Sequence, residues 1–283
     1  NVPGLPRLES ATFHGSYPTA RIEFRDSRMP VRVALDAFSP FIPLEADDSG
    51  LPLTFLRYRV RNPSRTARKV SIAFSIANPL GSPGRVNDVR RGNGVSGLFM
   101  HDPLLGRSDP MFGSFVLAAL DYDADVTFLR GWRGGTGWKV GPLHFWDEFS
   151  ATGRLTTAAA VRDSTGSLCL QRTIAPGREE AFVFMLAWHF PNRTADRCGW
   201  RAPKGREHDV IGNHYCTRFP NAWAVVEHAA PRLEEFETKT RAFVSALQGS
   251  TLPPAVKDAA TANLSTLATT TSFRTGDGVF RAF

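Results

Sequence analysis

Two acidic doublets are the first residues in this chain whose types could do chemistry. They are Asp47-Asp48 and Asp147-Glu148. Hydrolysis of a glycosidic bond uses two carboxyl groups on either side of one bond, about 5 Å apart in retaining enzymes and farther apart in inverting ones. Neighbouring residues of an extended segment point to opposite faces, so neither doublet makes such a pair by itself. The first doublet continues as Ser49-Gly50 and has the composition of a turn. We therefore expect no catalytic residue in this chain.

Tryptophans surround the second doublet. Trp132 and Trp138 precede it and Trp146 adjoins it, inside a Gly-rich insertion over 129–154 that has the composition of a loop. Aromatic rings on loops build ligand surfaces, so Asp147-Glu148 could contact a sugar in a groove beside these rings. The alternative is that the same rings fill a packing contact or a domain interface.

Other catalytic and ligand-binding signatures are missing from the sequence. The seven histidines form neither an H-E-x-x-H nor an H-x-H motif, so we expect no metal site. No G-x-S-x-G motif of a serine nucleophile occurs. The glycines of 92–94 and 131–137 lack the strand, helix and lysine of a phosphate-binding loop. We therefore expect no cofactor.

Composition narrows the class of protein. Cys169, Cys198 and Cys216 are odd in number and never spaced as C-x-x-C, which favours reduced thiols in a cytoplasmic protein. The net charge of +7 is dispersed rather than clustered, so no nucleic-acid partner is expected. No run approaches the roughly 20 apolar residues of a transmembrane segment. No signal peptide is visible either, although an exported form whose signal has been removed stays open.

Residues 8 to about 190 have the pattern of repeated strands. Strand-like segments run over 20–24, 31–36, 53–60, 69–77, 97–101, 112–120, 155–161, 167–173 and 180–188. Turn residues such as Asn62-Pro63 and Pro176-Gly177 separate them. Many strands without alternating helices predict a mainly β chain, an antiparallel two-sheet β-sandwich. Within 53–60 we expect Phe55 on the face opposite to Arg57 and Arg59.

The hydrophobic period changes after residue 220. Steps of four and three link Ala222, Val226, Ala229, Leu233, Phe236, Thr240, Phe243 and Leu247. These positions form one apolar stripe on a helix of about seven turns. Gly249 ends it and Pro253-Pro254 opens a second helix. We expect a β-sandwich domain over 1–215 and a C-terminal linker helix pair within 216–283. The stripe packs on the sandwich or on another domain, and both options stay open.

Several local motifs resemble one known family, in the same order along the chain. The segments are AFSPFIPL (37–44), LAWHFPNR (186–193), GNHY (212–215), NLSTL (263–267) and FRT (273–275). Together they are similar to glycoside hydrolase family 116, which includes bacterial β-glucosidases and the non-lysosomal glucosylceramidase. The chain starts at Asn1 and ends on an apolar VFRAF, and we interpret it as a piece of a longer polypeptide.

The resemblance implies an N-terminal β-sandwich followed by an (α/α)6 catalytic barrel. That barrel would hold the Glu nucleophile and the Asp acid/base of a retaining mechanism, so both would lie beyond Phe283. The implied role of this chain is the non-catalytic support of its own C-terminal barrel. The full protein would then act on a β-glucoside or a glucosylceramide-like substrate. The alternative is an independent carbohydrate-binding β-sandwich that uses Trp132, Trp138 and Trp146 as a stacking platform.

Overall fold

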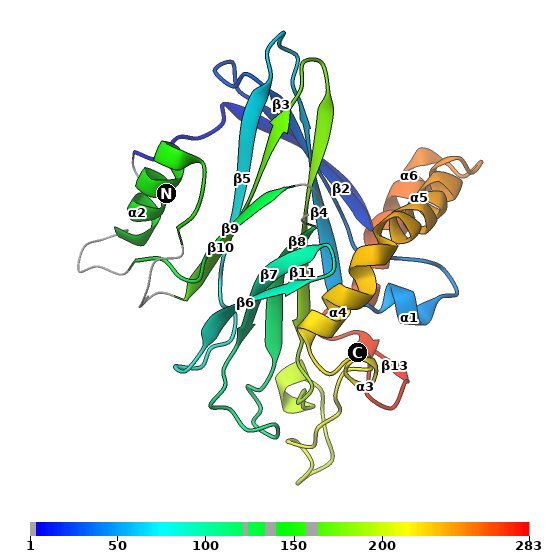
Figure 1. Cartoon of the computed structure of the whole chain (residues 1–283). Helices are drawn as coiled ribbons and strands as arrows, with labels where there is room; N and C mark the ends of the chain where they lie inside the picture. Colours follow the sequence, from blue (N-terminus) through cyan, green and yellow to red (C-terminus); the bar gives the residue numbers. More distant parts are fainter. Residues whose placement is uncertain (1–3, 121–123, 134–139, 157–163, 283) are drawn as a thin grey trace.

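The computed structural model of the chain describes residues 4–120, 124–133, 140–156 and 164–282 and shows a mainly β protein with few helices (Figure 1). A large antiparallel sheet has eight strands in the order β1-β2-β3-β4-β11-β8-β7-β6, and a smaller one has the order β5-β10-β9. The bounds are β1 Ser10–Ser16, β2 Thr19–Arg25, β3 Arg32–Phe38, β4 Leu53–Arg61, β5 Arg68–Ala77, β6 Val86–Gly92, β7 Val95–His101, β8 Ser114–Leu120, β9 Asp125–Leu129, β10 Thr165–Ile174 and β11 Glu179–His189. The predicted mainly β, antiparallel class is confirmed.

The smaller sheet covers one face of the large sheet. Strand β10 lies over β7, β8 and β11. A hydrophobic cluster fills the space between the sheets, with Leu117 and Phe184 from the large sheet and Leu168 and Leu170 from the small one. The small sheet has only three strands, so the two layers are unequal.

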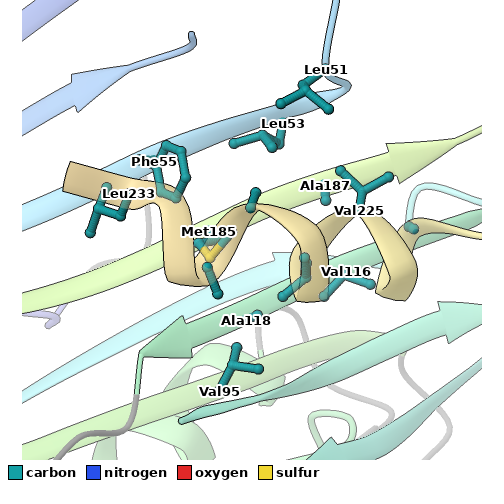
Figure 2. Close-up of a cluster of buried hydrophobic side chains, with 14 of the residues drawn as sticks. Leu51, Leu53, Phe55, Val95, Val116, Ala118, Met185, Ala187, Val225 and Leu233 are labelled. Carbon is teal, nitrogen blue, oxygen red and sulfur yellow. The ribbon is translucent and has the colours of Figure 1, made fainter. Parts of the chain in front are cut away.

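Helices cover the other face of the large sheet. Helix α4 (Ala222–Ala229) crosses β7, β8 and β11, and α5 (Leu233–Gln248) follows it (Figure 2). A second cluster joins Val225 and Phe236 of these helices to Phe55 and Met185 of the sheet. The apolar stripe, whose partner the sequence left open, therefore packs on the sheet from Ala222 to Phe236.

Strands β8 and β11 are covered on both faces. In β11, Phe184 faces the small sheet, whereas its neighbour Met185 faces the helices. The same division separates Leu117 from Val116 in β8. Both sides of these strands need apolar residues, so their sequences are continuous apolar runs rather than alternating ones.

The structure divides the predicted seven-turn helix. A 3-10 turn over Ala230–Arg232 separates α4 from α5. Pro231 lies in this turn, and because proline has no N–H to donate, it interrupts the regular helical hydrogen bonds. Helix α6 (Pro254–Leu264) follows, as Pro253-Pro254 predicted.

Other expectations about local structure are wrong. Phe55 and Arg57 lie on the same face of β4, because residues two apart share a face, and Arg57 reaches Glu234 and Glu237 of α5. The segment 129–154, expected as a loop, contains helix α2 (Val140–Thr152). The doublet Asp47-Asp48, expected in a turn, lies in the one-turn helix α1 (Ala46–Ser49).

The remaining short elements lie mostly near the C-terminal end. They are the 3-10 helices η1 (Asp196–Cys198) and η3 (Ser265–Leu267), α3 (Tyr215–Arg218), and a hairpin of β12 (Phe273–Arg274) and β13 (Phe280–Arg281). The strand expected over 155–161 falls mostly outside the described residues. The domain boundary at 215/216 stays a prediction, and the core shared by the large sheet and α4 crosses it.

Candidate functional site

The predicted aromatic site lies on the outer face of the small sheet. The Trp132 ring stacks on Phe145 of α2, with ring centroids 5.4 Å apart, and Phe145 stacks on Phe149. The indole N–H of Trp132 donates to the hydroxyl of Ser167, at 2.9 Å. These rings pack against a small buried cluster that includes Cys169. One face of Trp132 and its indole N–H are therefore already occupied within the chain.

The other predicted sugar-contact residues have separate surroundings. Trp146 is half-buried and leans against Phe149, whereas Asp147 is exposed. The Glu148 carboxylate accepts the backbone N–H of Thr156 at 2.6 Å, so it fixes the chain that leaves α2. Trp138 lies outside the described residues. The sugar-contact role of this group stays a prediction.

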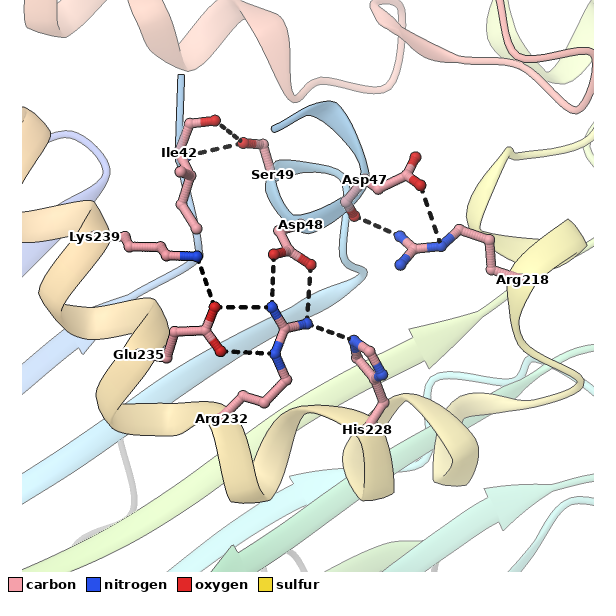
Figure 3. A network of polar contacts seen from close by, with 9 residues as sticks. All are labelled: Ile42, Asp47, Asp48, Ser49, Arg218, His228, Arg232, Glu235 and Lys239. Atoms are coloured by element: carbon pink, nitrogen blue, oxygen red, sulfur yellow. Dashed lines mark hydrogen bonds and ion pairs between the residues drawn. The ribbon is translucent and has the colours of Figure 1, made fainter. Parts of the chain in front are cut away.

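A second region, which sequence reasoning missed, is an ion-pair network between α1 and α5 (Figure 3). Arg232 donates to both oxygens of Asp48, at 3.0 and 2.8 Å, and to both oxygens of Glu235, at 2.9 and 3.1 Å. Lys239 adds a contact of 2.7 Å to Glu235. A guanidinium held by two carboxylates in paired geometry fixes both direction and distance. The network therefore fastens α1 to the start of α5.

The pKa values of this network follow from these pairs. Arg232 and then Lys239 hold the pKa of the Glu235 carboxyl at about 2, below its usual 4.5. The same hydrogen bonds, from Glu235 and Asp48, raise the pKa of Arg232. Burial and the neighbouring Arg232 lower the pKa of His228, whose ring nitrogen lies 2.9 Å from Arg232 Nη1. The shifts of Glu235 and Arg232 favour their charged forms at neutral pH, whereas that of His228 favours the uncharged ring.

The neighbouring Asp47 ties α1 to two later segments. Arg274 Nη1 of β12 lies 2.6 Å from Asp47 Oδ1, and Arg218 Nη1 of α3 donates to the Asp47 carbonyl at 2.5 Å (Figure 3 shows the Arg218 contacts). The hydrogen bond from Arg274 lowers the pKa of the Asp47 carboxyl. The doublet therefore connects segments about 170 to 230 positions away in sequence.

A cavity of about 560 Å³ lies beside Asp47. Aromatic and basic side chains from four parts of the chain line it, among them Trp188, Arg193, His214, Tyr215, Arg218, Phe273 and Arg274. Burial, and after it the charge of Arg274, lowers the pKa of His214, so its ring is neutral at pH 7. An aromatic pocket with convergent cations can hold a polar or anionic group. An ionised aspartate in it cannot serve as the general acid of a hydrolysis.

Two further observations bear on site chemistry. Within the ranges described, no group of three or more His, Cys, Asp or Glu side chains is arranged to hold a metal ion. None of the helices formed by the described residues has the length and hydrophobicity needed to cross a membrane.

The fold and these contacts define a class: a β domain with a helical layer, in which ion pairs join α1, α3, α5 and β12. Comparison with protein families makes this specific. The model for "beta-glucosidase 2, glycosyl-hydrolase family 116 N-term" matches residues 4–236. The chain therefore belongs to the family of N-terminal domains of glycosyl-hydrolase family 116, and the resemblance seen in the sequence motifs is confirmed.

Among solved structures, a chain described as a kojibiose phosphorylase from the human microbiome is similar, with a TM-score of 0.37 and 6% sequence identity. The match covers 80% of this chain and 23% of that chain, so this chain spans about a quarter of the length of that neighbour. A similarity this low carries no functional argument.

Proposed function

We propose that this chain is the non-catalytic N-terminal portion of a retaining β-glucosidase or glucosylceramidase-like glycoside hydrolase. In the full protein it supports an (α/α)6 catalytic barrel that acts on a β-glucoside or a glucosylceramide-like lipid. The family match over 4–236 carries the proposal. Phe236, at the end of that match, is fully buried in the core between the large sheet and its helices, so the matched segment coincides with one packed unit.

The charges of the described carboxyl groups support a catalytic centre elsewhere in the protein. A retaining mechanism needs a carboxylic acid whose pKa is raised, so that it can protonate the leaving group. Every described Asp or Glu with a shifted pKa is shifted downwards, with Asp47, Glu235 and Asp277 held low by arginines. Asp47, Glu235 and Asp277 therefore bind arginine side chains as ionised carboxylates.

The position of the ion pairs supports the proposal that this chain holds the catalytic barrel in place. They join α1, α3, α5 and β12, which all lie on the side of the molecule where the helices cover the large sheet (Figure 1). Helix α2, with Trp132 and Trp146, lies on the opposite side. We place the barrel against the helical side, with 1–215 as the sandwich and 216–283 as the helical linker. A ligand role for α2 would then be independent of the barrel.

The cysteines support a reducing compartment. Cys169, Cys198 and Cys216 are all unpaired in the structure, as in proteins that stay in the cytoplasm. We include a cytoplasmic location in the proposal. Oxidation of any two of them to a native disulfide in the purified protein would argue against it.

Hydrolysis of an aryl β-glucoside tests the proposal. The chain alone and the full protein that contains it are assayed side by side at equal molar concentration. We expect turnover only from the full protein. Turnover by the chain alone, at a rate comparable to that of the full protein, would overturn the claim that the catalytic carboxylates lie outside it.

A further inference from the structure

Strand β1 is an open edge of the large sheet. It pairs with β2 on one side through seven consecutive residue pairs, from Ser10 with Arg25 to Ser16 with Thr19. Helix α6 approaches it, yet every residue of β1 except Ser16 remains exposed to solvent. Such an edge presents unpaired N–H and C=O groups to another strand.

The side chains of β1 do not protect this edge. Proteins block strand edges with charged side chains, proline or bulges. In the described part of the molecule the other outer strands of the two larger sheets carry charge: Asp88, Arg90 and Arg91 on β6, Arg68 and Lys69 on β5, and Asp125 on β9. Strand β1 reads SATFHGS, with no Asp, Glu, Lys or Arg and no proline. Its seven pairs with β2 form an unbroken register without a bulge.

The sequence of β1 is also complementary to itself. In an antiparallel pair of two β1 strands in full overlap, residue 13 lies opposite its own copy and residue 12 opposite residue 14. Phe13 has 66% of its surface exposed, and its ring lies across Gly15, where a Cβ would meet it at 2.8 Å. On that face the paired Phe13 rings would have Ala11 and Gly15 beside them along β1, and Ile22 opposite them on β2. The other face would place Thr12 opposite His14, so no Asp, Glu, Lys or Arg of either β1 strand lies in the pairing.

We propose that β1 is a homodimerisation edge, where a second copy of this chain pairs antiparallel about Phe13. The partner must be neutral along the strand, and a second β1 meets this condition on both faces. The interface is isologous, since residue i of one copy meets residue j of the other and the reverse holds too. A pairing of seven residues is small compared with a standard protein interface of about 1,600 Å², so the dimer forms at high protein concentration and dissociates on dilution.

Sedimentation equilibrium of the full chain tests the association. We expect the mass to rise from the 31.1 kDa of one chain towards twice that value as concentration increases. Thr12→Lys places a charge in the middle of the edge and raises the dissociation constant by about tenfold or more. Val89→Lys is the matched control, because Val89 is partly exposed on the opposite edge strand β6, and it leaves the dissociation constant unchanged. An unchanged thermal midpoint of each variant shows that it folds.

Cross-linking tests the register. Phe13→Cys is expected to form a disulfide-linked dimer, because directly opposite Cβ atoms lie about 4.5–5.5 Å apart. Ser10→Cys is the control, because residue 10 meets residue 16 and the two copies of residue 10 lie roughly 20 Å apart. A monomer at all concentrations, equal effects of Thr12→Lys and Val89→Lys, or a cross-link from Ser10→Cys but not from Phe13→Cys would each overturn the proposal. In those cases the open edge is either unpaired or takes a different partner.

Discussion

Replacement of Arg57 by methionine should strongly destabilise the fold. The guanidinium lies 2.7 Å from Glu237 and 2.6 Å from Glu234, and the two contacts differ in burial. The side chains of Arg57 and Glu237 are 11% and 9% exposed, whereas Glu234 is 80% exposed. Removing one partner of a buried ion pair costs about 3–5 kcal/mol. The value for Arg57 lies at the lower end of this range, because the half-exposed Arg241 still lies 2.8 Å from the other oxygen of Glu237. An exposed pair contributes about 0–1 kcal/mol. The buried contact with Glu237 therefore dominates.

Urea denaturation at neutral pH measures this difference. We expect Arg57→Met to lower the free energy of unfolding by about 3 kcal/mol, and the control Glu234→Gln by less than about 1 kcal/mol. The double replacement Arg57→Met with Glu237→Leu removes both buried charges and should recover most of the loss. Equal effects of the two single replacements, or no recovery in the double variant, would refute the claim that this pair is desolvated between the sheet and α5.

Three further predictions test separate parts of the structure. Arg232 lowers the pKa of Glu235 from 4.5 to about 2. This pair therefore stabilises the fold above pH 4.5, and its stabilisation is lost as the pH falls towards 2. We expect the thermal unfolding midpoint of Glu235→Gln to fall less steeply than that of the unchanged chain in this window. Burial raises the pKa of Cys169 to about 11, so mass spectrometry should find its alkylation at pH 8 much slower in the folded chain than in urea. If α2 binds sugars independently, calorimetric titration with cello-oligosaccharides gives saturable heat that Trp146→Ala abolishes. Without saturable heat, we expect Trp132→Ala to reduce only stability, through its lost contact with Phe145.

Much of the sheet could be predicted because its strands have local signals. The segments 53–60, 69–77 and 180–188 correspond to β4, β5 and β11 with ends shifted by a residue or so. The edge strands β1 and β6 gave no such signal. An edge strand packs little on the core, so its sequence need not alternate between apolar and polar residues.

The helices show which signals were available and overlooked. Pro231 predicts the break between α4 and α5, because it removes a hydrogen-bond donor from the helix interior. Helix α2 begins near Pro142, a residue tolerated in a first helical turn, and Phe145 and Phe149 are spaced to lie on one face. The preceding glycines and the expectation of a loop concealed this pattern.

The ion-pair network could not be predicted from local sequence. Asp48 and Arg232 are 184 positions apart, and the composition around Asp47-Asp48 is that of a turn. Only the packing of α4 and α5 on the large sheet brings them together. The same holds for the cavity beside Asp47, whose lining comes from α1, the end of β11, α3 and β12.

The most direct test of the proposed function is a binding measurement between this chain and a separately produced catalytic domain of the same protein. We predict a saturable one-to-one complex in calorimetric titration, together with a gain in the activity of that domain on an aryl β-glucoside. A charge substitution on the exposed face of α5 or α6 should weaken the complex, whereas one on α2 should not. Full activity of the catalytic domain alone, with no detectable complex, would contradict the supporting role of this chain.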